Sequence, residues 1–565
     1  MTTDSTVPTR VLTGLGVSPG TVAGPVARLG LPPRPPVDEL PAADADAEVQ
    51  RVTEALETVA QGLEERAAKA GGQAAEILSA SALMARDPSV LAAVRDRLQA
   101  GRPTAAGVDA AFEQYCDLLA QAGGYLAERV ADLRDVRDRV LAVLLGEPMP
   151  GLPHPGHPYV LVARDLSPAD TAVLDPAEVL ALVTEKGGPT SHTAILASGL
   201  GIPAVVQCAN VLDLPEGSEV LVDGVSGKVT AAPGEETVRA ARSRADARRR
   251  LTASAHGPGR TADGVPVALL ANVATVEDAQ RAAKADCEGI GLFRTEGLYL
   301  DRVTAPAQGE QQAAYTAVFA AFTGRRVVVR TLDAGADKPL AFIPHEPEEN
   351  PALGVRGYRV SRHTPDLLDT QLAALGAAAR ATGADVRVMA PMISTPAEAK
   401  AFTDGVRQAG LPVAGTMIEV PAAALRARQL MRHTDFVSIG TNDLAQYTFA
   451  ADRLLGTLAD LLDPWQPALL QLIREVGQAG AATETPVGVC GTAAGDPLLA
   501  CVLVGLGVRS LSMPPTLLAD VRAALAHHTL AGCARMAERA LDAEDATAAR
   551  AAVRELAAPE VLGLL

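Results

Sequence analysis

The sequence predicts a multidomain α/β protein whose C-terminal half is a (β/α)8 TIM barrel. Eight short apolar segments, most of them followed by a helical pattern, recur over roughly 250 residues, which is typical of this barrel. Before them, strands and helices alternate on a smaller scale, and a long helical stretch interrupts the alternation. At 565 residues, the chain is long enough for three or four domains of about 150 residues each.

The composition indicates an acidic protein with ample material for packed cores. Hydrophobic residues make up 48% of the chain, and the formal net charge is −17. This charge disfavours binding to nucleic acid or to a membrane surface and suits a basic protein partner. The start MTTDSTVPTR has no apolar segment, no apolar run reaches the roughly 18 residues of a membrane helix, and the six cysteines form no CxxC. We therefore expect a cytoplasmic protein with reduced thiols.

The N-terminal part predicts a small α/β domain, to which we assign residues 1–35 and 150–234. Residues 10–30 alternate apolar residues with glycine and proline, which indicates short strands and turns. Four more strands are expected at Tyr159–Val162, Val179–Val183, Ala204–Val206 and Val220–Val222. Because the two parts form one domain, the segment between them is expected to be an insertion.

That insertion, residues 36–149, predicts a helical domain of about four helices. Apolar residues recur at helical spacing, and Arg86–Ser89 and Gly101–Thr104 interrupt the pattern. The pattern leaves open whether this bundle is purely structural or docks a partner. Residues 235–261 follow as a charged linker helix with a hinge at Gly257–Gly259, and the absence of interleaved aromatic residues argues against a nucleic-acid surface.

Residues 262–565 form the predicted barrel domain. Its strands are expected at Val267–Val273, Gly289–Phe293, Val327–Arg330, Val386–Pro391, Gly415–Glu419, Phe436–Gly440, Pro486–Cys490 and Ser510–Met513. Reactive residues of such barrels lie at the C-terminal ends of the strands. Polar or distinctive residues fall at these ends here: Arg294, Arg330, Met392, Glu419, Asn442, Asp443 and Cys490.

The stretch EKGGPTSHTA, residues 185–194, predicts a tight loop that leads into a helix. Pro189 favours the backbone geometry of a helix start, and Thr190 or Ser191 can cap it. His192 then lies in the first turn, where unpaired N–H groups and the helix dipole favour an anion. Its imidazole is suited to accept and hold a phosphoryl group. The alternative is a capping loop whose histidine is ordinary polar surface.

Several basic residues cluster near the predicted strand ends. Arg294 and Arg330 end successive strands, Arg356 and Arg453 lie in later loops, and Lys338 is a further candidate cation. An arginine is costly to bury without an anion, and its planar fork matches a phosphate. Together they predict a ligand with more than one negative charge. The alternative for any single arginine is a surface ion pair.

Two carboxylates and one thiol complete the candidate site. Glu419 and Asp443 can form structural salt bridges or hold a divalent cation, and Mg²⁺ commonly takes one or two protein carboxylates. The ligand pattern for zinc is absent. Cys490 lies between glycines in GVCGT, and we expect these glycines to leave its thiol open toward the strand ends. A lone cysteine is often a small buried hydrophobe, but this position favours a proton donor or nucleophile.

Long motifs along the whole chain carry a resemblance to a known family. They are LTGLGVSPGTVAGP, GGPTSHTAILA, GIGLFRTE, VVVRTLDAGADKP, ENPALGVRGYR, APMI, IEVPAA, SIGTNDLAQYTFAADR and VCGTAAGD. In this order, and with the helical insertion, the chain resembles enzyme I of the bacterial phosphoenolpyruvate-dependent sugar phosphotransferase system. The resemblance implies a swivelling phosphohistidine domain, a helical domain that binds the carrier HPr, and a phosphoenolpyruvate-binding barrel that forms a homodimer.

The resemblance also implies a two-step relay that uses Mg²⁺. His192 takes the phosphoryl group of phosphoenolpyruvate and passes it to HPr for sugar uptake, while Cys490 protonates the enolpyruvate to give pyruvate. The substrate contacts that it implies are Arg294, Arg330, Lys338, Arg356, Asn442 and Arg453, with Glu419 and Asp443 as the metal ligands.

The chain departs from the family pattern at a few positions. The family usually has arginine at Pro189, glycine at Ala336 and glutamate at Thr492, and its helical domain usually has a histidine within the stretch Ser79–Met84. These changes leave one alternative, a non-catalytic or specialised regulatory paralogue that binds phosphoenolpyruvate or another carrier. Pyruvate phosphate dikinases and phosphoenolpyruvate synthases share the barrel and the histidine domain but need an ATP-binding domain, for which no segment is free.

Overall fold

The chain forms two compact units, Met1–Ser243 and Arg244–Leu565. The structure is a computed structural model. It describes residues 10–564 except 19, 31–32, 42, 70–71, 123–128, 148–150, 154, 167–169, 171–173, 189–192, 195–196, 198–199, 225, 301, 336–338, 344–345, 347, 454 and 456–457.

An eight-stranded mixed sheet organises the first unit, with the strand order β1-β8-β7-β3-β4-β5-β6-β2. Strands β3 to β6 run parallel, and the others pair antiparallel. The strands are β1 (Arg10–Thr13), β2 (Leu15–Ser18), β3 (Thr21–Arg28), β4 (Tyr159–Ala163), β5 (Val179–Thr184), β6 (Ala204–Val206), β7 (Glu219–Asp223) and β8 (Lys228–Ala231). Because β1 to β3 pair with strands that begin after residue 158, the helices between them form an insertion, as predicted.

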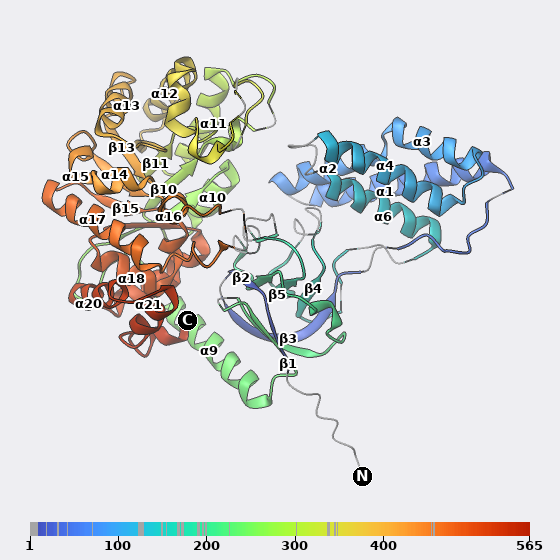
Figure 1. Ribbon diagram of the computed structural model, residues 1–565, viewed down its shortest axis with the longest axis horizontal. Helices are drawn as coiled ribbons and strands as arrows, with labels where there is room; N and C mark the ends of the chain where they lie inside the picture. The colour runs from blue at the N-terminus through green and yellow to red at the C-terminus, as the bar shows by residue number, and fades with distance from the viewer. Residues whose placement is uncertain are drawn as a thin grey trace, which may run out of the picture. The chain divides into compact units, whose positions relative to one another are not determined.

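Five helices are described within the insertion, where about four were predicted (Figure 1). Their shared core is apolar and buried, as the helical spacing of valine and leucine requires. Helix α3 shows how the sequence sets a boundary, because the Asp87 side chain accepts a hydrogen bond from the Ser89 N–H and Pro88 occupies the first turn. The helices are α1 (Ala45–Lys69), α2 (Gly72–Ala85), α3 (Pro88–Gln99), α4 (Thr104–Ala122) and α6 (Val130–Leu145).

The linker predicted from its charge is a helix, α9 (Glu235–Ala253). Ala241 is its buried residue, as expected for a helix that is polar on most sides. Near its C-terminal end the Arg248 guanidinium donates to the Asp520 carboxylate of α19 (Leu518–Ala526), with a distance of 3.3 Å from Nε to Oδ1. This ion pair holds the C-terminal end of the helix, which belongs to the second unit, against α19.

The second unit is a closed barrel of eight parallel strands in the order β10-β11-β12-β13-β14-β15-β16-β9 (Figure 1). All eight predicted strands are present, each end within two residues of its predicted position. Buried parallel strands form near-continuous apolar runs, which explains why they stand out in the sequence. They are β9 (Ala268–Val273), β10 (Gly289–Arg294), β11 (Arg326–Arg330), β12 (Asp385–Ala390), β13 (Val413–Ile418), β14 (Phe436–Ile439), β15 (Val487–Val489) and β16 (Ser510–Met513).

Helices surround the barrel, and local signals set their starts. Thr275 caps α10 and Thr395 caps α13, each through a reciprocal capping box. No helix in the described part of the chain is long and apolar enough to cross a membrane. In addition to α19, the helices are α10 (Val276–Lys284), α11 (Gln308–Ala320), α12 (Pro365–Thr382), α13 (Pro396–Gln408), α14 (Pro421–Leu425), α15 (Ala427–Leu430), α16 (Thr441–Phe449), α17 (Pro467–Thr483), α18 (Pro497–Gly505), α20 (Leu530–Leu541) and α21 (Ala546–Arg554).

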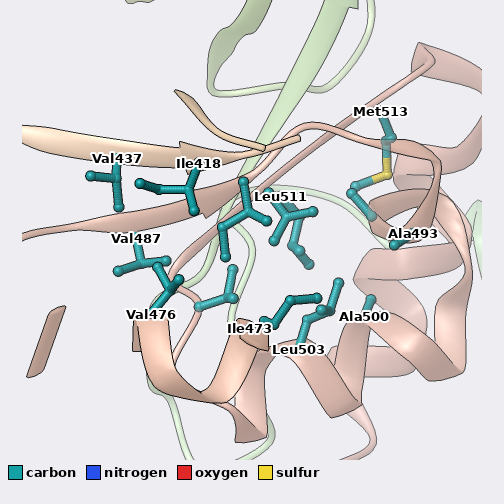
Figure 2. Close-up of a cluster of buried hydrophobic side chains, with 14 of the residues drawn as sticks. Ile418, Val437, Ile473, Val476, Val487, Ala493, Ala500, Leu503, Leu511 and Met513 are labelled. Carbon is teal, nitrogen blue, oxygen red and sulfur yellow. The ribbon is translucent and has the colours of Figure 1, made fainter. Parts of the chain in front are cut away.

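The main core of this unit lies between the strands and the outer helices. Figure 2 shows outward-facing side chains of β13 to β16 packed against α17 and α18. Small residues let the helices approach closely: a Cβ added at Gly477 of α17 would lie 1.9 Å from the Leu506 carbonyl oxygen. The labelled core residues are Ile418, Val437, Ile473, Val476, Val487, Ala493, Ala500, Leu503, Leu511 and Met513.

The close contact at Gly477 predicts a stability loss on substitution. Gly477→Ala should destabilise the barrel unit by about 1–3 kcal/mol, because the added methyl group collides with backbone. Gly405→Ala in α13 is the matched control: its Cβ would lie 3.8 Å from Leu372 Cδ1, and alanine favours a helix by up to about 1 kcal/mol. Trp465 is the single tryptophan and is buried in this unit, so urea denaturation followed by its fluorescence measures both variants. Equal stability of the two variants would contradict the packing argument.

Candidate active site

The predicted site residues meet at the C-terminal end of the barrel, which we call the mouth. Arg294 and Arg330 are the last residues of β10 and β11, and Glu419 and Cys490 directly follow β13 and β15. Asn442 and Asp443 lie in the first turn of α16, which follows β14. Because parallel strands of a closed barrel end on the same side, these side chains share one surface. His192 and Lys338 lie outside the described residues.

A buried network of charges crosses the mouth. Arg330 contacts Glu296 at 2.9 Å and Asp333 at 3.2 Å. Burial opposes the charged form of Arg330, but the attraction of Glu296 and Asp333 outweighs it and raises the pKa of Arg330 above its usual value. The arginine therefore stays charged although it is nearly inaccessible to solvent.

Arg356 is the most deeply placed member of this network. Its guanidinium lies 3.0 Å from Asp333 and 3.2 Å from Asp443, and it contacts the Tyr447 hydroxyl at 3.3 Å. The side chains of Arg356 and Asp333 are each 1% exposed. Arg453 contacts the other oxygen of Asp443 at 3.2 Å. In this structure Arg356 thus holds two carboxylates in place, and Asp443 is shared between two arginines.

Arg294 differs from the other arginines of the mouth. It is exposed at the end of β10, and within the described part of the chain it has no hydrogen-bond or ion-pair partner. Surrounding protein atoms and the nearby charge of Arg330 lower the pKa of Arg294. An uncompensated guanidinium next to another cation is a site for an anion.

Glu419 is the opposite case, a buried carboxyl group without an ion-pair partner in the described part of the chain. Its side chain is buried, and its Oε1 accepts a hydrogen bond from the Met392 N–H at 2.6 Å. Its Oε2 is buried with no hydrogen-bond partner in the described part of the chain. Burial, together with the charges of Asp443 and Asp333, raises the pKa of Glu419 to about 8. An unpaired buried carboxylate is stable only with a proton or a cation nearby.

The donor set fits a hard divalent cation and does not fit zinc. Among the described residues there is no group of three or more histidine, cysteine, aspartate or glutamate side chains that could hold a metal ion. Glu419 and Asp443 offer two carboxylates, which suits a cation that completes its shell with water and substrate oxygens. The structural observation that supports this fit is Oε2 of Glu419, which has no hydrogen-bond partner among the described residues.

Cys490 is more enclosed than the sequence suggested. We expected its flanking glycines to leave the thiol open, but the residue is 3% exposed and packs among the side chains of the barrel interior. Its Sγ lies 3.7 Å from the Ile439 carbonyl oxygen, to which it donates. Burial raises the pKa of Cys490. The protonated thiol is suited to proton donation rather than to nucleophilic attack as a thiolate.

Asn442 is oriented by Thr492, one of the residues that departs from the family pattern. The Thr492 hydroxyl donates to Asn442 Oδ1 at 2.8 Å, and the Thr492 backbone N–H donates to the same oxygen at 3.4 Å. Because two donors engage Oδ1, the side-chain NH₂ group of Asn442 is left to donate elsewhere. An amide held in this way can bind an anionic oxygen.

The sequence analysis missed three members of the mouth: Glu296, Asp333 and Tyr447. Asp333 follows Arg330 by three residues, and Glu296 follows Arg294 by two, so the motifs GLFRTE and VVVRTLD contained the signal. A carboxylate close to a strand-terminal arginine is a natural ion-pair partner. For Tyr447 the sequence offered no comparable signal, because its partner Arg356 lies 91 residues away.

The fold and the site define a phosphoenolpyruvate-utilising enzyme. Residues 248–530 match the family described as "PEP-utilising enzyme, PEP-binding domain", residues 155–227 match "PEP-utilising enzyme, mobile domain", and residues 13–129 match "PEP-utilising enzyme, N-terminal". Together the three matches cover most of the barrel, the second part of the mixed-sheet domain, and the first strands with most of the helical insertion.

Comparison with individual proteins shows which family within this class the chain belongs to. The chain is 51% identical over 552 residues to a phosphoenolpyruvate-protein phosphotransferase of Streptomyces coelicolor, a match that covers 97% of this chain and 99% of that protein. It is 41% identical to a phosphoenolpyruvate-protein phosphotransferase of Haloferax volcanii, with 95% and 97% coverage. The chain belongs to the phosphoenolpyruvate-protein phosphotransferase family, which confirms the resemblance seen in the sequence. A solution structure of Enzyme I (nEIt) is also similar, with 34% identity and a TM-score of 0.37, covering 42% of this chain and 99% of that one.

The contrast between Arg356 and Arg294 predicts different effects of the same substitution. Arg356→Gln should destabilise the barrel unit by about 3–5 kcal/mol, because it removes the most buried of the cations that pair with Asp333 and Asp443. Arg294→Gln should change the stability by less than about 0.5 kcal/mol, because this arginine has no partner to lose among the described residues. Urea denaturation followed by Trp465 fluorescence measures both. An Arg356→Gln protein as stable as the parent would show that the network does not support the fold.

The raised pKa of Glu419 predicts a dependence of stability on pH. Folding raises this pKa from its ordinary value of 4.5 to about 8, so the folded protein favours the protonated form. The resulting stabilisation is complete below the unfolded pKa and is lost as the pH rises through about 8. In the presence of a chelator, the parent should lose stability relative to Glu419→Gln as the pH rises from well below to above that value, as measured by thermal unfolding. The exposed Glu277→Gln should follow the parent, and parallel curves for parent and Glu419→Gln would contradict the assignment.

Proposed function

We propose that this protein transfers the phosphoryl group of phosphoenolpyruvate to a protein carrier by way of a phosphohistidine at His192. The observation that carries the proposal is the guanidinium of Arg294, which has no hydrogen-bond or ion-pair partner among the described residues and lies beside Arg330 at the mouth. In a member of this family, two such cations at strand ends form a site for the phosphate of phosphoenolpyruvate. The alternative of a non-catalytic paralogue is less well supported, because every residue expected of the relay is in the sequence.

Substrate binding is proposed to rest on charge and positioning. Arg294, Arg330, Arg453 and Lys338 would neutralise the phosphate and carboxylate groups, and the NH₂ group of Asn442 would donate to a phosphate oxygen. Phosphoryl transfer depends mainly on such positioning and neutralisation. Arg453 contacts Asp443 in this structure, so it would exchange that carboxylate for the substrate. Arg356, although expected to bind substrate, would act chiefly by holding Asp443.

Glu419 and Asp443 are proposed to hold Mg²⁺. When bound, Mg²⁺ would offset negative charge on the phosphoryl oxygens. The two carboxylates suit it because Mg²⁺ commonly takes one or two protein carboxylates and completes its shell with water and substrate oxygens. Asp443 is oriented by Arg356 and Glu419 by the Met392 N–H, so both ligands are held before the substrate arrives.

The chemistry is proposed to take place in two steps on the substrate. The imidazole of His192 would attack phosphorus, so that a P–N bond forms and the P–O bond to enolpyruvate breaks. The thiol of Cys490 would then give its proton to the methylene carbon, so that a C–H bond forms and pyruvate leaves. A buried thiol with a raised pKa is protonated at neutral pH, as this step requires.

We also propose a partner protein, a role for each domain and a cellular location. The relatives are named protein phosphotransferases, and a net charge of −17 suits a basic carrier of the HPr type. The helical domain, residues 36–149, would dock that carrier, residues 1–35 and 150–234 would carry the phosphohistidine, and the linker at 235–261 would let this domain move. The barrel, residues 262–565, would form the homodimer. The six free cysteines fit a reducing cytoplasm.

The proposal predicts a covalent intermediate. With phosphoenolpyruvate labelled on its phosphate and Mg²⁺, the parent protein should acquire a label that is stable to alkali and labile to acid. His192→Ala should acquire none, because the acceptor nitrogen is missing, and the exposed His157→Ala should label like the parent. An unlabelled but folded parent would reject the catalytic function and favour the regulatory paralogue.

A further inference from the structure

Gln371 is a polar residue on the buried face of α12, which is otherwise apolar. The residue is 1% exposed, and the buried positions next to it on the helix are Leu372, Ala374 and Leu375. A buried amide is unfavourable unless its polar atoms find partners. A methionine would fill the same space without this requirement, so the glutamine indicates a role beyond packing.

The hydrogen bonds of Gln371 join the two segments that carry the arginines at the ends of β10 and β11. We call residues 294–296 and 330–333 the strand-end segments, and each begins with one of these arginines. The Oε1 of Gln371 accepts a hydrogen bond from the Leu332 N–H at 3.0 Å. Its Nε2 donates to Thr295 Oγ1 at 3.1 Å. One side chain of α12 therefore bridges both segments.

The direction of each of these bonds is fixed, because a backbone N–H can only donate. It must face Oε1 of Gln371, so the NH₂ group points to Thr295 and to the Tyr315 hydroxyl, which lies at 3.1 Å. Since each hydroxyl accepts one of these two protons, each gives its own proton to another acceptor. Thr295 donates to the Arg330 carbonyl oxygen at 3.0 Å. Tyr315 donates to Gln311 Oε1 at 3.2 Å. The amide of Gln371 is thus held in one orientation.

The backbone ladder between β10 and β11 ends where these bonds begin. Arg294 and Arg330 are its last register partners. Beyond this pair, the Thr295 hydroxyl and the Gln371 amide connect the two strand-end segments. We propose that Gln371 is a positioning residue, which fixes Arg294 relative to Arg330 so that both guanidinium groups can contact one phosphate group. The inference rests on the proposed function, in which these arginines bind the phosphate of phosphoenolpyruvate.

Glu296 makes a second link between the strand-end segments, which differs in kind. Its Oε1 accepts hydrogen bonds from the Arg330 guanidinium at 2.9 Å and from the Asp333 N–H at 3.1 Å. A phosphate group that binds Arg330 would compete with this carboxylate. Gln371 is neutral, and its hydrogen bonds to the segments involve neither arginine side chain. They therefore hold the two segments together both with and without the ligand.

Two matched glutamine variants test the inference. Gln311 of α11 is likewise 1% exposed. Its amide is hydrogen-bonded to the Tyr299 hydroxyl, the Tyr315 hydroxyl and the Pro306 carbonyl oxygen. None of these partners belongs to the strand-end segments. Gln371→Met and Gln311→Met each remove one buried amide, and urea denaturation followed by Trp465 fluorescence should show a comparable loss of stability.

Binding should distinguish the two variants. Phosphoenolpyruvate with Mg²⁺ is titrated calorimetrically into each variant in the His192→Ala background, which lacks the proposed phosphoryl acceptor. Gln371→Met should raise the Kd for phosphoenolpyruvate on the order of tenfold or more, because small displacements of a positioned group are costly. Gln311→Met should bind like His192→Ala alone. Thr295→Val breaks the same link at its other end and should weaken binding in the same direction, whereas Thr295→Ser, which keeps the hydroxyl, should restore it.

The effect should also depend on the pair of arginines. When Arg294→Gln is added, Gln371→Met should raise the Kd much less than it does with Arg294 present, because the spacing of two guanidinium groups no longer matters. Equal binding by Gln371→Met and Gln311→Met, or an effect that does not depend on Arg294, would overturn the inference. If the His192→Ala protein itself did not bind phosphoenolpyruvate, the proposed function would be rejected instead.

Discussion

The structure of the mouth depends on the buried ion pairs of Arg356 with Asp333 and Asp443. Both carboxylates lie close to Glu419, and their charges act on it strongly enough to raise its pKa. Removing a buried cation from its ion pairs with buried carboxylates is strongly unfavourable. Arg356 therefore supplies positive charge between Asp333 and Asp443, and it gains further support from the Tyr447 hydroxyl.

Once these pairs are formed, two side chains of the mouth still have polar groups without partners among the described residues. These groups indicate what kind of ligand the site binds. In the part of the chain that the structure describes, Arg294 is a cation without a partner, and Glu419 is a buried carboxyl group with one unpartnered oxygen. A ligand that combines an anionic group with a divalent cation satisfies both at once. The backbone at Met392 is also part of this arrangement. Its φ is 58°, and its N–H donates a hydrogen bond to Glu419. A buried methionine in this conformation is strained, and such strain is common where a side chain or N–H must be aimed.

The sequence revealed the barrel and most of the mouth because both depend on local patterns. Parallel strands are apolar along their whole length, so Arg294, Arg330 and Glu419 stood out as the first polar residues after such runs. β8 (Lys228–Ala231) was missed because it alternates over four residues only. The burial of Cys490 and the contact between Thr492 and Asn442, which are 50 residues apart, depend on how strands are placed around the barrel. No short window of sequence contains that information.

The contact between Thr492 and Asn442 also changes the meaning of a departure from the family pattern. A glutamate at this position would place a negative charge near Cys490 and Asn442, whereas threonine supplies a neutral donor that fixes the amide. A glutamate at this position would disfavour the loss of the proton from the Cys490 thiol, because its charge would repel the thiolate. Threonine has no such effect. The proposed acceptor His192 belongs to the first unit and Cys490 to the second. A substitution in the barrel can therefore change the pKa of Cys490, the proposed proton donor. It leaves His192, the proposed phosphoryl acceptor, unchanged.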